Sequence, residues 1–251
     1  MSYGMYLSAE GAKVQSQRLE FIANNLANLE TPGFKRDVPT FQARFAEAIQ
    51  QGSDYPGSRS RNDLGGGVKL IDVDTDFSTG TLRSTKNDTD FAVNGEGFFQ
   101  VRTPSGETLL TRAGDFNIDA QGRLLTQTGR YEVLDDSGGA IKIDPEQPWQ
   151  FLPGGMINQG GSQTPLGLQK PESLGDLVKV GNNTFRALGT VTPVPTEQRD
   201  IRQGYLEQSG VSSTIAMMEM IETSRAFEAN TKLIQHQDGM LSQLLSRVLR
   251  S

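Results

Sequence analysis

The sequence of 251 residues contains no cysteine, one histidine and one tryptophan. Without cysteine there is no disulfide and no thiolate chemistry, and a zinc site would depend on His236 alone. No apolar run approaches the roughly 18 residues of a membrane-spanning helix. The stretch from Met1 to Glu10 lacks the basic and apolar regions of a Sec signal peptide. If the protein leaves the cytoplasm, we therefore expect a dedicated secretion machine and no cleaved signal.

An excess of basic charge is also absent, because the net charge is −6 and the pI is near 5.0. A nucleic-acid-binding protein needs a basic face to neutralise phosphates, so this class is excluded. The charge is unevenly distributed: segments 1–44 and 205–251 are almost balanced, and residues 45–204 carry the net negative charge. Nearly neutral ends can approach copies of themselves without strong repulsion.

Three kinds of segment follow one another along the chain. Residues 1–50 are predicted to be mostly helical with one break, residues 51–67 to be a flexible loop, and residues 68–204 to form strands and turns. Residues 205–251 form the last segment, with one long helix predicted over 211–250. The order of these segments predicts an α+β fold, with α-helices at both ends and a central domain rich in antiparallel β-structure.

Both predicted helices carry apolar side chains at intervals of seven residues, which is typical of a coiled-coil seam. The C-terminal series is Met220, Phe227, Ile234, Leu241 and Val248, and the N-terminal series is Leu7, Val14 and Phe21. The positions three residues before the C-terminal series, from Met217 to Leu245, are only half apolar. The same periodicity fits two amphipathic helices packed on an ordinary core, so this alternative remains open.

No arrangement of residues typical of catalysis or of metal binding stands out. Asp72, Asp74 and Asp76 begin like a calcium loop, but Phe77 replaces the glycine expected at the sixth position and Arg83 the glutamate at the twelfth. Alternation places the three aspartates on one face of a strand, where we expect a solvated acidic surface. We therefore predict no catalytic residue, no cofactor and no metal ligand.

Four segments resemble one protein family. They are 23–36 (ANNLANLETPGFKR), 90–101 (DFAVNGEGFFQV), 111–129 (TRAGDFNIDAQGRLLTQTG) and 203–245, which contains SRAFEANTKLIQ. In this order they resemble the flagellar rod and hook proteins, whose N-terminal motif is N-N-[LI]-A-N followed by G-F-K-R and whose C-terminal motif centres on [QR]-[AR]-[FY]-E.

The resemblance implies a structural protein of the periplasmic rod in the flagellar basal body, and not an enzyme. It also implies that the N- and C-terminal α-helices pair in a coiled-coil-like layer. It implies export in the unfolded state by the flagellar type III apparatus, and assembly with other rod subunits and with copies of itself into a helical tube. Within the family, the length and the string Ser224–Glu228 are most similar to the proximal rod branch. The distal rod branch is the alternative, since some of its members carry an extra segment to which 51–67 may be compared.

The candidate assembly residues come from the two apolar series and from the family motifs. We expect Asn24, Asn25 and Asn28 to fix the register between subunits, and Arg225 to pair with Glu222 and Glu228 along the helix. The full set is Leu7, Val14, Phe21, Asn24, Asn25, Leu26, Asn28, Gly33, Phe34, Met220, Arg225, Phe227, Glu228, Ile234, Leu241 and Val248.

Two other classes of function remain open at this point. A cell-wall hydrolase would need a pair of carboxylates 5–10 Å apart in a cleft of the β-rich domain (about the separation known for glycosidases). A soluble helical adaptor would be a stable monomer that never polymerises.

Overall fold

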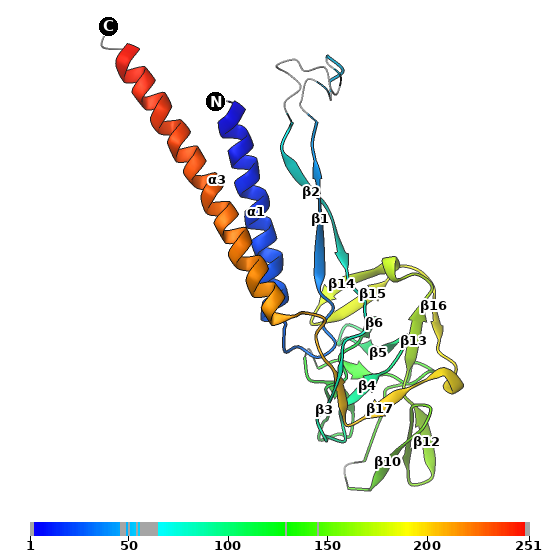
Figure 1. The fold of residues 1–251 in the computed structure, drawn as a ribbon. Coiled ribbons are helices and arrows are strands. Elements are labelled where there is room, and N and C mark those ends of the chain that lie inside the picture. The colour runs from blue at the N-terminus through cyan, green and yellow to red at the C-terminus, as the bar shows by residue number, and fades with distance from the viewer. Residues whose placement is uncertain are drawn as a thin grey trace. The chain divides into compact units, whose positions relative to one another are not determined.

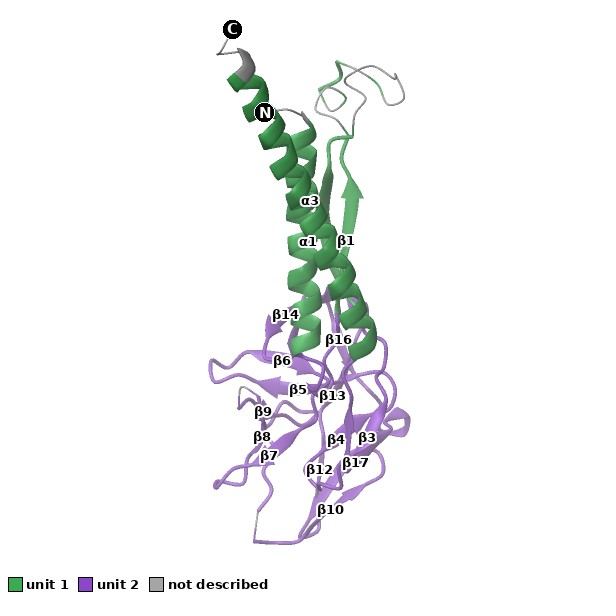
Figure 2. Cartoon of the chain, turned by 60° about the vertical axis from the view of Figure 1, so that its left-hand side comes forward, with its two compact units in different colours: residues 1–27, 37–76, 211–251 green, residues 28–36, 77–210 purple. Residues whose placement is uncertain are grey.

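The computed structural model describes residues 3–45, 49, 51–53, 55, 65–128, 130–144 and 146–248, apart from the side chains of Tyr3, Arg247 and Val248. The chain forms two compact units, shown in Figure 2: unit 1 contains residues 1–27, 37–76 and 211–251, and unit 2 contains residues 28–36 and 77–210.

Two antiparallel helices dominate unit 1 (Figure 1). Helix α1 spans Tyr3–Ala27 and ends shortly before Pro32, whose missing N–H and fixed φ do not allow the helix to continue. Helix α3 spans Ser213–Val248, and its first turn closes when the Ala216 N–H donates to the Ser212 carbonyl at 2.9 Å. The long C-terminal helix and its pairing with an N-terminal helix are confirmed.

A β-hairpin completes unit 1. Strand β1 (Asp37–Ala43) pairs antiparallel with β2 (Val68–Thr75), and a bulge interrupts the register between Thr40 and Phe41. Residues 1–50 were expected to be mostly helical, and this expectation is wrong for residues 37–43. The physical reason is local: Pro39 cannot donate to a helix, whereas it is tolerated in a hairpin strand.

Unit 2 is built from antiparallel strands. Its largest sheet has the order β14-β15-β6-β5-β9-β8-β7, with β13 attached to β5 and β16 attached to β13. Smaller sheets pair β17 with β4 and β18 with β3, and a three-stranded sheet has the order β10-β11-β12. The strands are β3 (Leu82–Ser84), β4 (Phe91–Val93), β5 (Phe98–Arg102), β6 (Thr108–Thr111), β7 (Phe116–Ile118), β8 (Leu124–Thr126), β9 (Glu132–Val133), β10 (Trp149–Leu152), β11 (Met156–Gln159), β12 (Ser162–Pro165), β13 (Leu168–Pro171), β14 (Leu177–Gly181), β15 (Thr184–Ala187), β16 (Val191–Pro193), β17 (Ile201–Gln203) and β18 (Tyr205–Glu207). Two short 3-10 helices, Leu174–Asp176 and Thr196–Gln198, join neighbouring strands.

The core of unit 2 lies between these strands. Phe91 and Phe99 are fully buried, and their rings contact Phe116 at centroid distances of 6.1 and 5.2 Å. Trp149 packs against the same cluster from β10. A hairpin turns at Gly122: β7 pairs with β8, and Gly122 has the positive φ, 77°, that its turn requires.

The structure divides the chain differently from the boundaries expected from sequence. Strand β2 was expected to open the central domain at residue 68 but belongs to unit 1, and residues 28–36 belong to unit 2. The predicted loop 51–67 lies largely outside the described residues. Within it, the Gly66 N–H donates to the Arg44 carbonyl at 2.8 Å and extends the β1–β2 pairing at the loop end of the hairpin.

Candidate assembly surfaces

The pairing of α1 with α3 rests on two layers in which glycine faces an amide side chain. A Cβ added to Gly4 would lie 3.1 Å from Gln237 Nε2, and one added to Gly11 would lie 3.0 Å from Asn230 Oδ1. A step of seven residues forward in α1 thus matches a step of seven backward in α3. Glycine allows the two helices to approach closely, and the amides give the pair a defined register.

The predicted C-terminal series lies along this seam. Met220, Phe227 and Ile234 are half-buried. Their companions are the positions four residues earlier, among which Ala216 and Thr223 are 6% and 3% exposed. The sequence pattern had indicated positions three residues earlier, from Met217 to Leu245. The true companions are small or polar and leave no apolar stripe in the sequence: Ala216, Thr223, Asn230 and Gln237.

The predicted N-terminal series lies on a different side of α1. At 100° per residue, Leu7, Val14 and Phe21 share a side with Glu10 and Asn25. Asn25 binds the hairpin: its Nδ2 donates to the Asp37 carbonyl and its Oδ1 accepts from the Asp37 N–H, both at 2.9 Å. Glu10 borders Gly67 at the far end of β2. Val14, 8% exposed, is therefore buried on the side of α1 that faces the hairpin.

The other residues of the N-terminal motif have varied surroundings. Asn24 is exposed and Leu26 is half-buried. Asn28 Oδ1 accepts a hydrogen bond from Thr31 Oγ1 at 3.2 Å, in the turn that follows α1. Asn25 and Asn28 thus fix local geometry inside the subunit, while their predicted role between subunits stays a prediction.

Gly33 and Phe34 are buried in unit 2. Gly33 has a φ of 64°, and a Cβ there would lie 2.4 Å from the carbonyl carbon of Arg112. The Lys179 ammonium lies 4.7 Å from the centre of the Phe34 ring and donates to the Lys35 carbonyl at 2.6 Å. Both motif residues therefore hold the segment after α1 against the β-strands of unit 2.

A buried charge cluster, formed by Lys35, Arg112 and Glu207, closes the same region. Lys35 Nζ lies 2.6 Å from Glu207 Oε1, and the two side chains are 2% and 1% exposed. Arg112 Nη1 lies 3.5 Å from Glu207 Oε2, and burial lowers the pKa of this guanidinium. Lys35 also donates to the Ser78 carbonyl, and Glu207 accepts from the Gly80 N–H, both at 2.8 Å.

This cluster joins residues that lie far apart in the sequence, and it was not predicted. The Gly33 N–H donates to the Glu207 carbonyl at 2.8 Å, so the segment entering unit 2 is bound to the strand leaving it. A lone lysine, arginine or glutamate gives no sequence signal of such pairing. The Gly-Phe-Lys motif was the one indication, and it was assigned to contacts between subunits.

Exposed charged and apolar side chains lie along α3. Arg225 and Glu228 are exposed, and neither forms an ion pair within the described part of the chain, so the predicted ladder with Glu222 is absent there. Leu241 is 38% exposed, and the side chain of Val248 lies outside the described residues. More than half exposed are Ile215, Met217, Met218, Ile221, Leu233, Met240, Leu244 and Leu245.

Three family models match successive parts of the chain. They are described as flagella basal body rod protein (residues 5–35), flagellar hook protein FlgE/F/G D1 domain (92–159) and flagellar basal body rod FlgEFG protein C-terminal (202–247). The flagellar basal-body rod protein FlgF of Caulobacter vibrioides is 34% identical over 94% of this chain and 94% of its own length. The chain belongs to the flagellar basal-body rod family.

Other members of the rod family match over similar lengths. FlgG of Bacillus subtilis is 32% identical over 98% of this chain and 99% of its own length. FlgG of Caulobacter vibrioides is 29% identical over 95% of this chain and 98% of its own length. The models for the two ends of a rod protein cover α1 and α3, so the family resemblance includes the helices whose surfaces are described above.

A hydrolase would need its carboxylates in a cleft, and unit 2 contains a cleft of about 900 Å³. Its carboxylates, Asp119 and Glu132, are paired with Arg123 at 2.8 and 3.0 Å. Burial acts to raise the pKa of Asp119, but hydrogen bonds from Arg123 and Gln121 outweigh it and lower that pKa. A general acid requires a raised pKa, so this pair does not suit glycoside hydrolysis.

The described residues offer neither a membrane-spanning helix nor a metal-binding cluster. No helix in this part of the chain has the length and apolarity of a membrane span. The same residues contain no cluster of three histidine, aspartate or glutamate side chains suited to a metal ion. Asp72 and Asp74 lie exposed on β2, where Asp74 Oδ2 accepts from Thr40 Oγ1 at 3.4 Å.

Proposed function

We propose that this chain is a structural subunit of the flagellar basal-body rod, of the proximal type, which polymerises through its terminal helices with other rod subunits and with copies of itself. The similarity to rod proteins over nearly the whole chain carries the proposal. The surface of α3 supports it, because its exposed apolar side chains would be buried by neighbouring subunits. Each such Leu, Ile or Met would contribute about 1.5–3 kcal/mol when fully buried.

The assignment to the proximal branch rests on a comparison within one organism. In Caulobacter vibrioides, the proximal rod protein FlgF is 34% identical to this chain and the distal rod protein FlgG is 29% identical. The distal role is the second candidate, because FlgG of Bacillus subtilis reaches 32%.

The proposal includes the location and the route to it. We place the protein in the periplasmic part of the basal body, reached through the flagellar type III export apparatus. The absence of cysteine supports this route, because an unfolded chain without thiols cannot form wrong disulfides in an oxidising compartment.

The proposed function is tested in cells that lack the native gene. Complementation with this chain is expected to restore swimming, and the protein is expected to copurify with basal bodies. A rod built outward from its base adds proximal subunits first. This chain should therefore remain in basal bodies from cells that lack the distal rod subunit. Loss from those basal bodies would assign it to the distal branch, and absence from all basal bodies would contradict the rod proposal.

A further inference from the structure

The turn between β4 and β5 contains the one Asn-Gly sequence of the chain, Asn94–Gly95. The backbone nitrogen that follows an asparagine can attack the side-chain amide carbon and close a five-membered ring. Glycine is the most favourable residue in the following position, because it has no Cβ to hinder the approach and adopts backbone conformations that other residues avoid. Among the asparagines of the chain, Asn94 is therefore the one whose sequence context best suits this reaction.

The turn is open to solvent. Asn94, Gly95 and Glu96 are exposed, although Val93 and Gly97 on either side are buried. Gly95 has a φ of 134°, and a Cβ added to it would have no atom within 4 Å. Within the described part of the chain, the Gly95 N–H donates to no acceptor. The nitrogen that must attack is thus not held in the hydrogen bond of a strand or helix.

The side chain of Asn94 lies against an acidic residue. Asn94 Nδ2 donates to Asp200 Oδ2, and the Asn94 N–H donates to the Asp200 carbonyl at 2.8 Å. Asp200 comes directly before β17, whose Ile201 pairs with Val93 of β4. An ionised aspartate accepts hydrogen bonds and cannot donate them, so the side-chain contact depends on the amide of Asn94.

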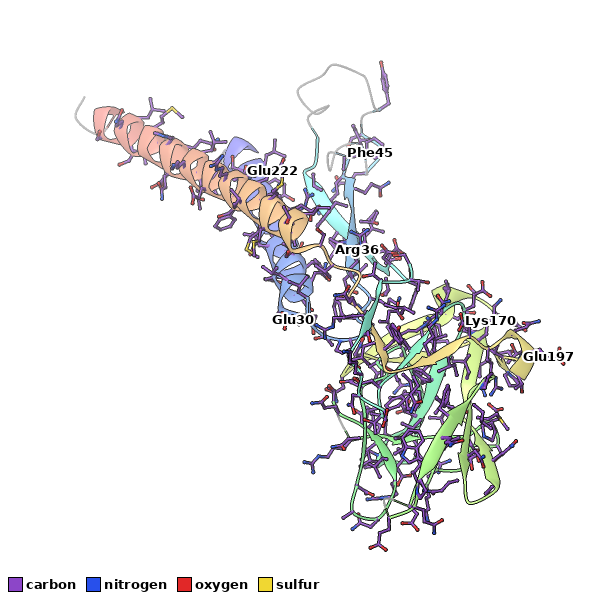
Figure 3. The ribbon with its side chains drawn as sticks, turned by 60° about the horizontal axis from the view of Figure 1, so that its bottom comes forward. Glu30, Arg36, Phe45, Lys170, Glu197 and Glu222 are labelled. Atoms are coloured by element: carbon purple, nitrogen blue, oxygen red, sulfur yellow. The ribbon has the colours of Figure 1, made fainter. Side chains whose placement is uncertain are left out.

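The backbone of the same turn supports the buried charge cluster. Arg112, a member of that cluster, donates from Nη2 to the Gly95 carbonyl at 2.7 Å and from Nη1 to the Val93 carbonyl at 3.4 Å. On the solvent side, Glu96 is paired with Lys170 of β13, which is labelled in Figure 3. A change in the backbone of this turn would therefore act on a buried arginine as well as on the surface.

We propose that Asn94 is a site of spontaneous deamidation, with the Gly95 nitrogen as the nucleophile. The Gly95 N–H gives its proton to solvent, its nitrogen bonds to Asn94 Cγ, and the Cγ–Nδ2 bond breaks. The released nitrogen regains a proton from solvent and leaves as ammonia. Water then opens the cyclic imide at either of its carbonyl carbons. Opening at Cγ gives aspartate, and opening at the backbone carbonyl carbon gives isoaspartate, whose main chain is one atom longer.

Either product replaces a hydrogen bond by a repulsion between like charges. The new carboxylate faces the Asp200 carboxylate and cannot donate to it, and Arg202 Nη2, 3.6 Å from Asp200 Oδ2, offsets part of the added charge. Isoaspartate also displaces the Gly95 carbonyl, to which Arg112 is bonded. We therefore expect a modified turn to lower the urea concentration at which unit 2 unfolds, with the larger loss for isoaspartate.

Mass spectrometry of the purified full chain tests the site. The chain is incubated in mildly alkaline buffer and digested with trypsin at intervals, which places Asn94 in the peptide 87–102. We expect conversion of amide to acid to appear first at Asn94, as two products that chromatography separates. Asn117 is the internal control, because it is exposed but precedes Ile118, whose branched side chain hinders the attack. Asn94→Gln should lose the modification, since its longer side chain would have to close a six-membered ring.

Urea titrations followed by the fluorescence of Trp149 test the effect on unit 2. Asn94→Asp should unfold at a lower urea concentration than the wild-type chain, because it places a carboxylate against Asp200. Asn117→Asp is the matched control: it makes the same chemical change on an exposed position whose side chain has no hydrogen bond within the described residues, so it should leave the midpoint unchanged.

Three outcomes would overturn the inference. Equal conversion of Asn94 and Asn117 would show that the turn does not favour the attack. Conversion of Asn94 only after the chain has been unfolded in urea would show that the folded turn prevents it. Equal midpoints for Asn94→Asp and Asn117→Asp would show that the contact with Asp200 does not stabilise unit 2. All three are measured on the purified chain, so none of them depends on the proposed rod function.

Discussion

Removing the charge of Glu207 should destabilise unit 2 more than any other single charge change in the buried cluster. Glu207 faces both Lys35, at 2.6 Å, and Arg112, at 3.5 Å, and it is 1% exposed. Glu207→Gln keeps the shape of the side chain but leaves two buried cations without their carboxylate. Breaking a buried ion pair from one side costs about 3–5 kcal/mol, which is a large part of a typical domain's 5–15 kcal/mol.

The order of the effects distinguishes this argument from simple loss of packing. Lys35→Met removes one cation, and Glu207 keeps Arg112, so the cost should be smaller than for Glu207→Gln. In Lys35→Met/Glu207→Gln no lysine charge is left uncompensated, and the double variant should be more stable than the sum of the single changes predicts. The control is Glu107→Gln, which removes an exposed pair with Arg186 and should leave the denaturation midpoint unchanged.

The single tryptophan provides the measurement. Trp149 packs against the core of unit 2, so its fluorescence in a urea titration of the full chain reports that unit. Circular dichroism at 222 nm follows α1 and α3 in the same samples. If Glu207→Gln unfolds at the same urea concentration as Glu107→Gln, the buried cluster does not stabilise unit 2 and the reasoning is refuted.

Three further predictions concern other parts of the chain. Burial, together with the neighbouring Asp90, raises the pKa of Asp115 from 3.8 to about 6. The stability of unit 2 should therefore fall as pH rises from about 4 to about 6. Asp115→Asn should remove this dependence and gain about 1–2 kcal/mol at pH 7 after allowance for solvent screening, and urea titrations at both pH values that show no difference would contradict it. Gly33→Ala should lower the denaturation midpoint of unit 2 far more than Gly106→Ala. Both glycines have positive φ, but only at Gly33 would the added Cβ meet backbone atoms, 2.4 Å from the Arg112 carbonyl carbon; equal denaturation midpoints would show that this close approach is not needed. Phe227→Asp, in the helix seam, should abolish swimming of complemented cells, whereas His236→Ala, on an exposed position, should not; the reverse result would favour an enzyme.

The sequence predicted those features that depend on local pattern. The seven-residue spacing of Met220, Phe227 and Ile234 identified the helix and one series of its seam, because apolar side chains at that interval leave a continuous stripe. The turn at Gly122 was predictable because its backbone conformation needs glycine. The family motifs likewise indicated that residues near Gly33 matter, without showing what they contact.

The features that sequence reasoning missed depend on pairing between distant segments. Strand β1 was read as helix because its partner β2 lies more than twenty residues away, beyond the predicted loop. Asn230 and Gln237 are polar, so the sequence indicates surface residues. In the structure they lie opposite Gly11 and Gly4, in the seam between the helices. In both cases the deciding interaction is with a segment far away in the sequence, so neither local propensity nor periodicity predicts it.

The seam of α3 differs between the part that α1 covers and the part beyond it. Where α1 covers it, one series of the seam is the half-buried Met220, Phe227 and Ile234, and the other includes Asn230 and Gln237, whose amides face glycines of α1 and set a register. Where α1 does not cover it, Leu241 and Leu244 continue the same seam with apolar side chains. This arrangement suits a subunit whose own two helices must pair in one register and which must also bind neighbouring subunits. Because apolar area supplies most of the free energy of association, we infer that Leu241 and Leu244 contribute to contacts outside the subunit.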